Sequence, residues 1–283
     1  MPPRSHPTAR QARLGAELRK LRERAGMSGR DVGAFLGGER ATVSHLESGR
    51  HGISAERLRR LVAFLGVNDP EYVDLLAGMA EERGAQWWTE YKGLLPPALL
   101  DIAELEHHAK YLRTVQLLAV PGILQTDEYA RAIFKTSNPA LPDAELDVRV
   151  RQRMARRRIL QRQSPTPLDV IIHEAGLRMR YGSRKVTGSQ LEFLLGACDW
   201  PSVTVRVIPF EIEAFSGYTQ SMLFAGGPVP QLDTVEIDNA HSVDFLYADT
   251  QLHQCRELIS SVSRVALDPI ASRDFIHHVS QEM

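Results

Sequence analysis

Residues 28–50 constrain the fold of this chain most, because they carry two short helical patterns joined by a tight turn. The first pattern places a small residue, Ala34, on its inner face and ends at the pair Gly37–Gly38. The second pattern is apolar at Val43 and Leu46 and polar elsewhere. Two helices joined by a short glycine-containing turn are typical of a helix-turn-helix, which presents its second helix to the DNA major groove. DNA binding is therefore the first hypothesis for this segment.

The residues around this segment predict further helices. Apolar residues before it recur every three or four positions, which is the spacing of an amphipathic helix. Ser28, followed by Asp31, resembles a capping box at a helix start. Two more amphipathic stretches begin after Ser54 and at Pro70. We therefore expect five short helices in one all-α domain over residues 10–82.

Three runs in this region carry a resemblance to a known family. They read LRKLRERAGMS, DVGAFLG and TVSHLESGR, and they match in register over roughly residues 10–66. The region is similar to the lambda-repressor-like (XRE) DNA-binding domain. The resemblance implies an ion pair between Arg22 of the first helix and Glu47 of the third. Its expected role is structural and its expected position partly buried.

The same resemblance implies which residues face DNA. Arg40, Ala41 and His45 fall at the base-reading positions, and an arginine can donate two hydrogen bonds to a guanine. Residues near Gly49 are expected to contact phosphates, which fix register without reading sequence. The residues expected at the DNA interface are Ser28, Arg30, Arg40, Ala41, Thr42, Ser44, His45, Ser48 and Arg50.

One position departs from the family pattern. The family often carries glutamine directly after the capping serine, and this chain has Gly29. The corresponding DNA contact is then lost or passes to Arg30. The alternative for the whole motif is a helix-turn-helix that only packs or binds protein.

Charge is distributed unevenly along the chain. Residues 1–66 contain 13 Lys and Arg against 6 Asp and Glu, whereas the remainder contains 21 against 29. A basic end favours contact with the DNA backbone, and such an attraction weakens as salt rises. Solvated helices also carry a moderate positive balance, so charge alone does not establish DNA binding.

Length predicts more than one domain. A chain of 283 residues with 43% hydrophobic residues can bury a second core. No apolar run is long enough to span a membrane, and the basic N-terminus lacks the apolar region of a secretory signal. We expect a cytoplasmic, nucleoid-associated protein without a membrane partner. Its expected parts are a flexible arm over 1–9, the DNA-binding domain over 10–82 and a second domain over 83–283.

The second domain reads as α+β with about five strands. Short β-branched or aromatic runs, LDVIIHE, VTVRVIPF, SMLFAG, TVEID and DFLYAD, predict the strands. Residues 98–119 read as one long helix, because apolar residues recur there at roughly helical spacing. Further helices are expected over 143–163, 188–198, 249–265 and 269–281. Strand order does not follow from the sequence.

The second domain also carries a resemblance. The segments WWTEYKGLLP, PGILQTDEYARA and VIIHEAGLRMRYGS, in this order, look like a large actinobacterial family of helix-turn-helix regulators described as antitoxin-like. PGILQTDEYARA is the most specific of them. The resemblance implies a partner-binding or signal-sensing domain, and it implies a small partner protein encoded by a neighbouring gene. It does not identify the signal.

A Pro-Gly break inside the second domain is a candidate ligand or partner site. Such a break with convergent polar groups suits a pocket, although a plain helix–helix turn with capping side chains explains it equally well. The dense arginine run over 149–162 is open to three readings, namely a second nucleic-acid surface, a solvated helix face or an interface with an acidic partner. The candidate residues at the break are Pro121, Gly122, Gln125, Thr126 and Tyr129.

The sequence offers little for catalysis or metal binding. His107–His108 and His277–His278 are adjacent pairs, which point about 100° apart on a helix and do not chelate one ion together. His241, Ser242 and Asp244 are triad residue types without the required convergence from separate elements. We expect no enzymatic activity, no metal and no cofactor.

These observations favour a sequence-specific transcriptional regulator with a sensing or interaction domain. The expected DNA partner is double-stranded, and two-fold symmetry predicts a homodimer on a pseudo-palindromic site. One alternative is an antitoxin-like protein that binds a small neighbouring-gene product and uses DNA binding for autoregulation. The second alternative is a small-molecule-responsive repressor.

Overall fold

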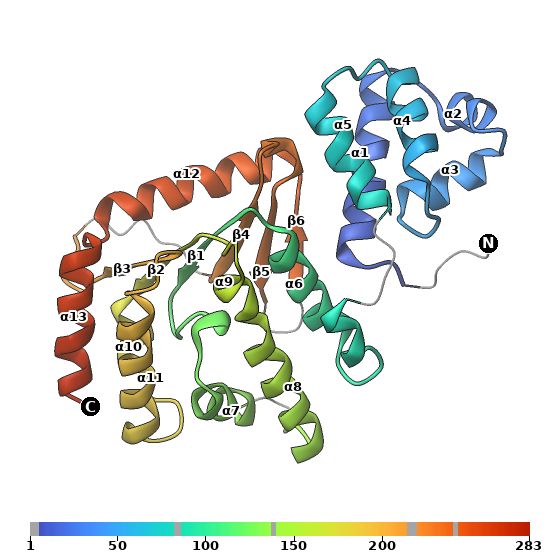
Figure 1. Cartoon of the computed structure of the whole chain (residues 1–283). Helices are drawn as coiled ribbons and strands as arrows, with labels where there is room; N and C mark the ends of the chain where they lie inside the picture. The colour runs from blue at the N-terminus through green and yellow to red at the C-terminus, as the bar shows by residue number, and fades with distance from the viewer. Residues whose placement is uncertain (1–5, 82–85, 137–139, 214–219, 240–242) are drawn as a thin grey trace. The chain divides into compact units, whose positions relative to one another are not determined.

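The computed structural model describes residues 6–81, 86–136, 140–213, 220–239 and 243–283. The chain divides into two compact units, residues 1–90 and 91–283, called the head and the body below (Figure 1). The expected arm lies mostly in residues 1–5, and the expected boundary at 82/83 lies in residues 82–85, both outside the described residues. No helix of the described residues is both long and apolar enough to cross a membrane.

The head contains the five expected helices. Ser28 and Asp31 form the predicted capping box at the second, and Ser54 caps the fourth through the Arg57 amide. Gly26 follows the first helix with a φ of +66°, a conformation that favours glycine. Leucine and valine side chains from all five helices form the head's core, Leu58 and Leu76 being fully buried. The helices are α1 (Ala9–Arg24), α2 (Gly29–Phe35), α3 (Arg40–Glu47), α4 (Ala55–Phe64) and α5 (Pro70–Glu81).

The small residue inside the helix-turn-helix is Gly33, and the expectation for Ala34 was wrong. Gly33 is buried, whereas Ala34 is exposed. A Cβ at Gly33 would lie 3.1 Å from the Gly38 carbonyl oxygen and from the Glu39 carbonyl carbon, so the turn before α3 needs the space. The sequence alone does not show which of the two adjacent small residues, Gly33 or Ala34, faces the core. The position of the following turn decides it.

Two further glycines bring α1 against the end of α3. A Cβ at Gly15 would meet the backbone oxygen of Glu47 at 2.5 Å, and one at Gly49 would meet the backbone oxygen of Gln11 at 2.7 Å. Gly49 also has a φ of +73°. This close backbone approach fixes the position of α3 relative to α1.

The body is built on one six-stranded mixed sheet of order β3-β2-β1-β4-β5-β6. Strands β1, β2 and β3 are parallel, and β4, β5 and β6 continue antiparallel from β1. The strands are β1 (Tyr111–Gln116), β2 (Leu168–His173), β3 (Val203–Ile208), β4 (Met222–Gly226), β5 (Thr234–Asp238) and β6 (Val243–Leu246).

Helices surround this sheet on both faces (Figure 1). One face carries α12 over a core that includes Val115, Ile171 and Phe224. The other face carries the larger core, in which α11 packs against α13 and α7. A separate small cluster packs α7 against α8. The helices are α6 (Pro97–His108), α7 (Asp127–Lys135), α8 (Asp143–Arg156), α9 (Arg158–Gln161), α10 (Glu174–Arg178), α11 (Arg184–Ala197), α12 (Asp249–Val265) and α13 (Pro269–Gln281). Three short 3-10 helices complete the elements: η1 (Trp87–Tyr91), which spans the boundary between the head and the body in the sequence, η2 (Gly122–Leu124) and η3 (Pro230–Leu232).

The α+β class is confirmed, but the sheet has one strand more than expected. The long helix expected over 98–119 was wrong, because α6 ends at His108 and residues 111–116 form β1. β1 lies between β2 and β4, and both faces of it are covered by protein cores. The missed strand is therefore a central element of the body.

Candidate functional site

The outer face of α3 is exposed, and its inner face is fixed in the head's core. Val43 and Leu46 are 2% and 6% exposed and hold the inner face. Arg40, Ala41, Thr42 and Ser44 are all exposed, and His45 is half-buried beside the ring of His51, 4.9 Å away. The residues expected to read bases therefore lie on the side of the helix that faces away from the core.

Arg40 lies beside the start of α2. A Cβ at Gly29 would lie 3.5 Å from the Arg40 Cγ, an ordinary van der Waals contact. The aliphatic part of Arg40 thus lies against the position where the family often has glutamine. Arg30 is exposed on α2, and Ser28 accepts the Asp31 amide at 3.3 Å as the helix cap.

The end of α3 also carries the residues expected at phosphates. Ser48 caps the helix and donates its hydroxyl to the His45 carbonyl at 3.2 Å. Arg50 is exposed two residues further on. The sequence did not single out Arg57, which donates to the Leu36 carbonyl at 2.8 Å and so ties α4 to the end of α2.

Arg22 and Glu47 form the expected ion pair. The Arg22 Nε lies 2.5 Å from one Glu47 carboxylate oxygen, and its Nη2 lies 3.1 Å from the other. A third N–H of Arg22 donates to the Met27 carbonyl at 2.9 Å. The two side chains are 15% and 12% exposed, and the hydrogen bonds to Glu47 raise the pKa of Arg22 despite the opposing effect of burial. The pair therefore joins α1 to the end of α3 and is mostly shielded from solvent.

Replacing Arg22 with alanine should lower the free energy of unfolding of the head by about 2–3 kcal/mol, because Glu47 keeps a poorly solvated charge without its partner. Amide hydrogen exchange in α1 and α3, measured on the whole chain without DNA, tests this. The matched control is Arg19→Ala, which breaks the exposed Arg19–Glu23 pair on the same helix and should leave amide exchange nearly unchanged. Unchanged exchange in Arg22→Ala would show that the pair has no structural role.

The body contains a polar cavity of about 210 Å³ beside the Pro-Gly break. Its walls come from α6, α7, α8, the residues around η2 and the strands β1, β2, β4 and β5. Three of the candidate site residues, Pro121, Gly122 and Gln125, line it. The charged residues that line it are Glu106, Arg153, Arg156, Glu236 and Asp238.

Thr126 and Tyr129 have other positions. Thr126 caps α7, and its amide donates to the Gln190 side chain at 2.7 Å. Tyr129 is 1% exposed, packs against the Tyr181 ring and accepts the Val120 amide at 3.5 Å. Burial raises the pKa of Tyr129. The capping alternative therefore describes Thr126, whereas Pro121, Gly122 and Gln125 line the cavity.

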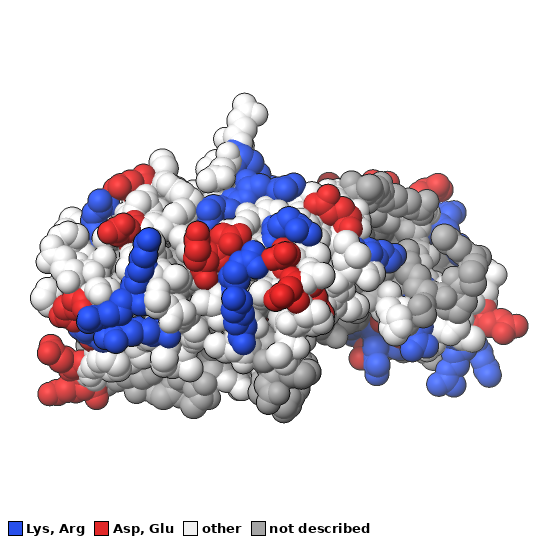
Figure 2. All heavy atoms as spheres, turned by 90° about the horizontal axis from the view of Figure 1, so that it is seen from below, with Lys and Arg blue, Asp and Glu red and all other residues white. Residues whose placement is uncertain are grey.

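The arginine run has a mainly structural role within the body. Arg156 binds Glu106, Arg149 binds Glu145, and Arg153 donates to the Gln125 side chain at 2.7 Å. Arg157 donates to the carbonyls of Ile123 and Gln125. On the face of the body that Figure 2 shows, Lys and Arg are interspersed with Asp and Glu. This arrangement does not favour a second nucleic-acid surface.

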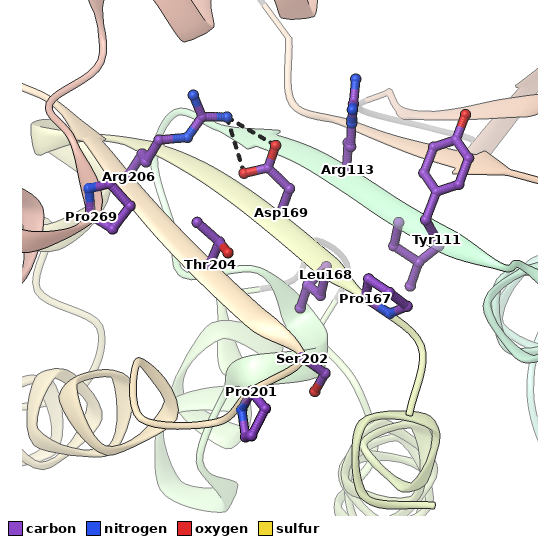
Figure 3. A pocket seen from close by; sticks show the side chains of 11 residues that line it. Tyr111, Arg113, Pro167, Leu168, Asp169, Pro201, Ser202, Thr204, Arg206 and Pro269 are labelled. Atoms are coloured by element: carbon purple, nitrogen blue, oxygen red, sulfur yellow. Dashed lines mark hydrogen bonds and ion pairs between the residues drawn. The ribbon is translucent and has the colours of Figure 1, made fainter. Parts of the chain in front are cut away.

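A second, more open pocket of about 520 Å³ lies over the first residues of β1, β2 and β3 (Figure 3). Tyr111, Arg113, Asp169 and Arg206 point to the same side of the sheet there. Arg206 is already paired with Asp169 at 2.8 Å and contacts the Ser263 hydroxyl. The two most buried charged side chains of this pocket, Arg206 and Asp169, therefore neutralise each other.

Metal-binding and reactive groups are sparse in the described parts of the chain. No group of three or more His, Cys, Asp or Glu side chains there is placed to hold a metal ion. Cys198 and Cys255 are free thiols, and burial raises the pKa of both. Of the three triad residue types, His241 and Ser242 lie outside the described residues.

Comparison with known families matches both units. Residues 13–76 match a family model described as a helix-turn-helix domain. Residues 99–278 match one described as a domain of unknown function, DUF5753. Comparisons with curated proteins and with solved structures give no match. The helix-turn-helix domain supports a DNA-binding regulator, and because the second model covers more than half of the chain, this protein belongs to the DUF5753 family.

Proposed function

We propose that this protein is a sequence-specific transcriptional regulator of the XRE type, acting in the cytoplasm. The observation that carries the proposal is the division of α3 into a buried inner face and an exposed outer face with Arg40 at its start. A helix held in this way can enter the major groove as a rigid unit. The basic balance of residues 1–66 supplies attraction to phosphates.

Arg40→Ala should weaken binding at the preferred site by about 1–3 kcal/mol and relax specificity at one base pair. The physical reason is the loss of a two-pronged hydrogen bond to a base edge. Selection of bound sites from random duplexes by the parent chain and by the variant measures both effects. Arg60→Ala, an exposed arginine on α4, is the control. Equal weakening of Arg40→Ala on all sequences would make Arg40 a phosphate contact.

The same selection tests dimerisation. A two-fold homodimer should recover a pseudo-palindrome with half-sites one helical turn apart, about 34 Å, or a multiple of it. A single asymmetric half-site would contradict the dimer and leave the DNA-binding proposal intact. Recovery of no sequence motif would contradict the proposal itself.

A ligand-responsive regulator is a second candidate, and the polar cavity of the body favours it. The cavity lies beside the most specific sequence element of this domain and is lined by charged side chains from helices and strands. Small-molecule sites are concave and carry a few placed polar groups. Release from DNA on ligand binding is the expected behaviour.

A further inference from the structure

The floor of the cavity in the body is a row of three side chains on adjacent strands. Thr114 of β1 pairs with Leu223 of β4, and Leu223 pairs with Glu236 of β5. All three line the cavity. Directly paired residues share one face of a sheet, so Leu223 lies between the hydroxyl of Thr114 and the carboxyl group of Glu236. The Thr114 hydroxyl donates to the Met222 carbonyl at 2.8 Å, which fixes it in place.

Arg153 supplies the positive side of the cavity. It donates to the Gln125 side chain at 2.7 Å, and its guanidinium lies 4.1 Å from the centre of the Phe134 ring. Its Nε has no hydrogen-bond partner in the described chain. Arg153 is half-buried and lines the cavity. Burial, with the charge of Arg156, lowers the pKa of Arg153 to about 9, although the charges of Asp238 and Glu106 act in the opposite direction. An anion beside Arg153 would relieve this cost.

Glu236 and Asp238 supply the negative side. They lie two residues apart on β5 and therefore point to the same face. Glu236 is 6% exposed, and its Oε1 has no hydrogen-bond partner among the residues that the structure places. Burial first, then the charge and hydrogen bond of Asp238, raise the pKa of Glu236 well above its usual range. A cation or a strong hydrogen-bond donor would satisfy this side.

The remaining charges of the cavity already neutralise each other. The Arg156 Nε and Nη2 lie 2.7 and 2.5 Å from the two carboxylate oxygens of Glu106. Both side chains are buried, at 9% and 2% exposure. Besides this pair, the charged residues that line the cavity are Arg153 on α8 and the two acidic residues Glu236 and Asp238 on β5. Its volume of about 210 Å³ corresponds to roughly seven water molecules, which suits a ligand smaller than a drug-sized compound.

We infer that this cavity binds a small zwitterion, an aminocarboxylic acid, with its carboxylate on Arg153 and its ammonium group on Glu236 and Asp238. The inference rests on the proposed sensing role of the body, for which it names the chemical class of the signal. In the open pocket of Figure 3 the acidic side chain, Asp169, is already paired with Arg206.

Isothermal titration calorimetry of the whole chain tests the inference with a homologous series of probes. Glycine, β-alanine, γ-aminobutyrate and δ-aminovalerate carry the same two charges at increasing separation. One member should bind with one site per chain. Acetate and methylammonium, which carry one charge each, should bind at least 10-fold more weakly than that member.

Two substitutions locate the site. Arg153→Gln and Glu236→Gln should each weaken binding of the best probe at least 10-fold. Arg151→Gln on α8 and Glu257→Gln on α12, both exposed, should leave binding unchanged. Arg153→Lys keeps the charge and should retain more binding than Arg153→Gln, which separates loss of the ligand contact from loss of folding. Circular dichroism melting of each variant checks that it is folded.

Several outcomes overturn the inference. These are no binding by any member of the series, acetate binding as tightly as the best member, or equal binding by methylammonium. The last would indicate a site for a basic side chain of a protein partner. DNA binding is measured separately on the same samples by gel shift. Sequence-specific DNA binding without zwitterion binding would refute this inference and leave the proposed regulator intact.

Discussion

Replacing Glu106 with alanine should lower the free energy of unfolding of the body by about 3–5 kcal/mol. Glu106 is 2% exposed and accepts two hydrogen bonds from Arg156, which is itself buried. Burial lowers the pKa of Arg156, but the charge of Glu106 and its hydrogen bonds to the guanidinium outweigh this effect and raise the pKa of Arg156. The substitution leaves this guanidinium in a poorly solvated place and opens a gap between α6 and α8. Amide hydrogen exchange in β1 and β2 of the whole chain measures the loss.

Two variants make this test specific. Glu106→Gln keeps the shape and part of the hydrogen bonding, so its loss should be smaller than that of Glu106→Ala. Glu192→Ala removes an exposed carboxylate from α11 and should change stability by less than about 0.5 kcal/mol. If the amides of β1 and β2 exchanged as slowly in Glu106→Ala as in Glu192→Ala, the Glu106–Arg156 pair would not stabilise the body.

Replacing Glu17 with alanine should have a comparable effect in the head, about 3–5 kcal/mol. Glu17 is 1% exposed and accepts from Arg13 at 2.6 Å and from the Tyr72 hydroxyl, which joins α1 to α5. Burial and the hydrogen bond to Glu17 raise the pKa of Tyr72, so the phenol stays protonated and donates. Small domains are stable by only about 5–15 kcal/mol. The variant should therefore lose much of its DNA binding together with its protection from hydrogen exchange.

The control in the head is Glu56→Ala. Glu56 is 83% exposed on α4, and its nearest cation, Arg60, lies 3.8 Å away. An exposed pair of this kind contributes under about 1 kcal/mol. Near-equal stability of Glu17→Ala and Glu56→Ala would mean that the buried group in α1 is dispensable.

The head could be predicted closely from the sequence because its signals are local. Caps such as Ser28 with Asp31, and apolar residues at helical spacing, act within a few positions of each other. The Arg22–Glu47 pair connects distant positions, and it followed from the family resemblance and not from periodicity. Ala34 and Gly33 were confused because both are small, and only the neighbouring turn decides between them.

The body was harder to predict because its signals are long-range. Leu105, Ala109 and Leu112 continue a helical spacing across the end of α6, so the sequence hid the start of β1. Pairing with β2 and β4 decides the conformation of that segment. The cavity was found only in part, since Glu106 and Glu236 come from distant elements. One signal was present, because Arg149, Arg153 and Arg156 recur at helical spacing and so share a face of α8.

The central place of β1 also governs the order in which the nascent chain can acquire structure. Its two neighbours in the sheet are made later, and 108 residues separate Thr114 from the Met222 carbonyl that it contacts. At about 5–20 residues per second of translation, this interval lasts roughly 5–20 s. The helices of the head contact one another, and all of them are synthesised before β1. The head can therefore fold before the strands that pair with β1 have been synthesised.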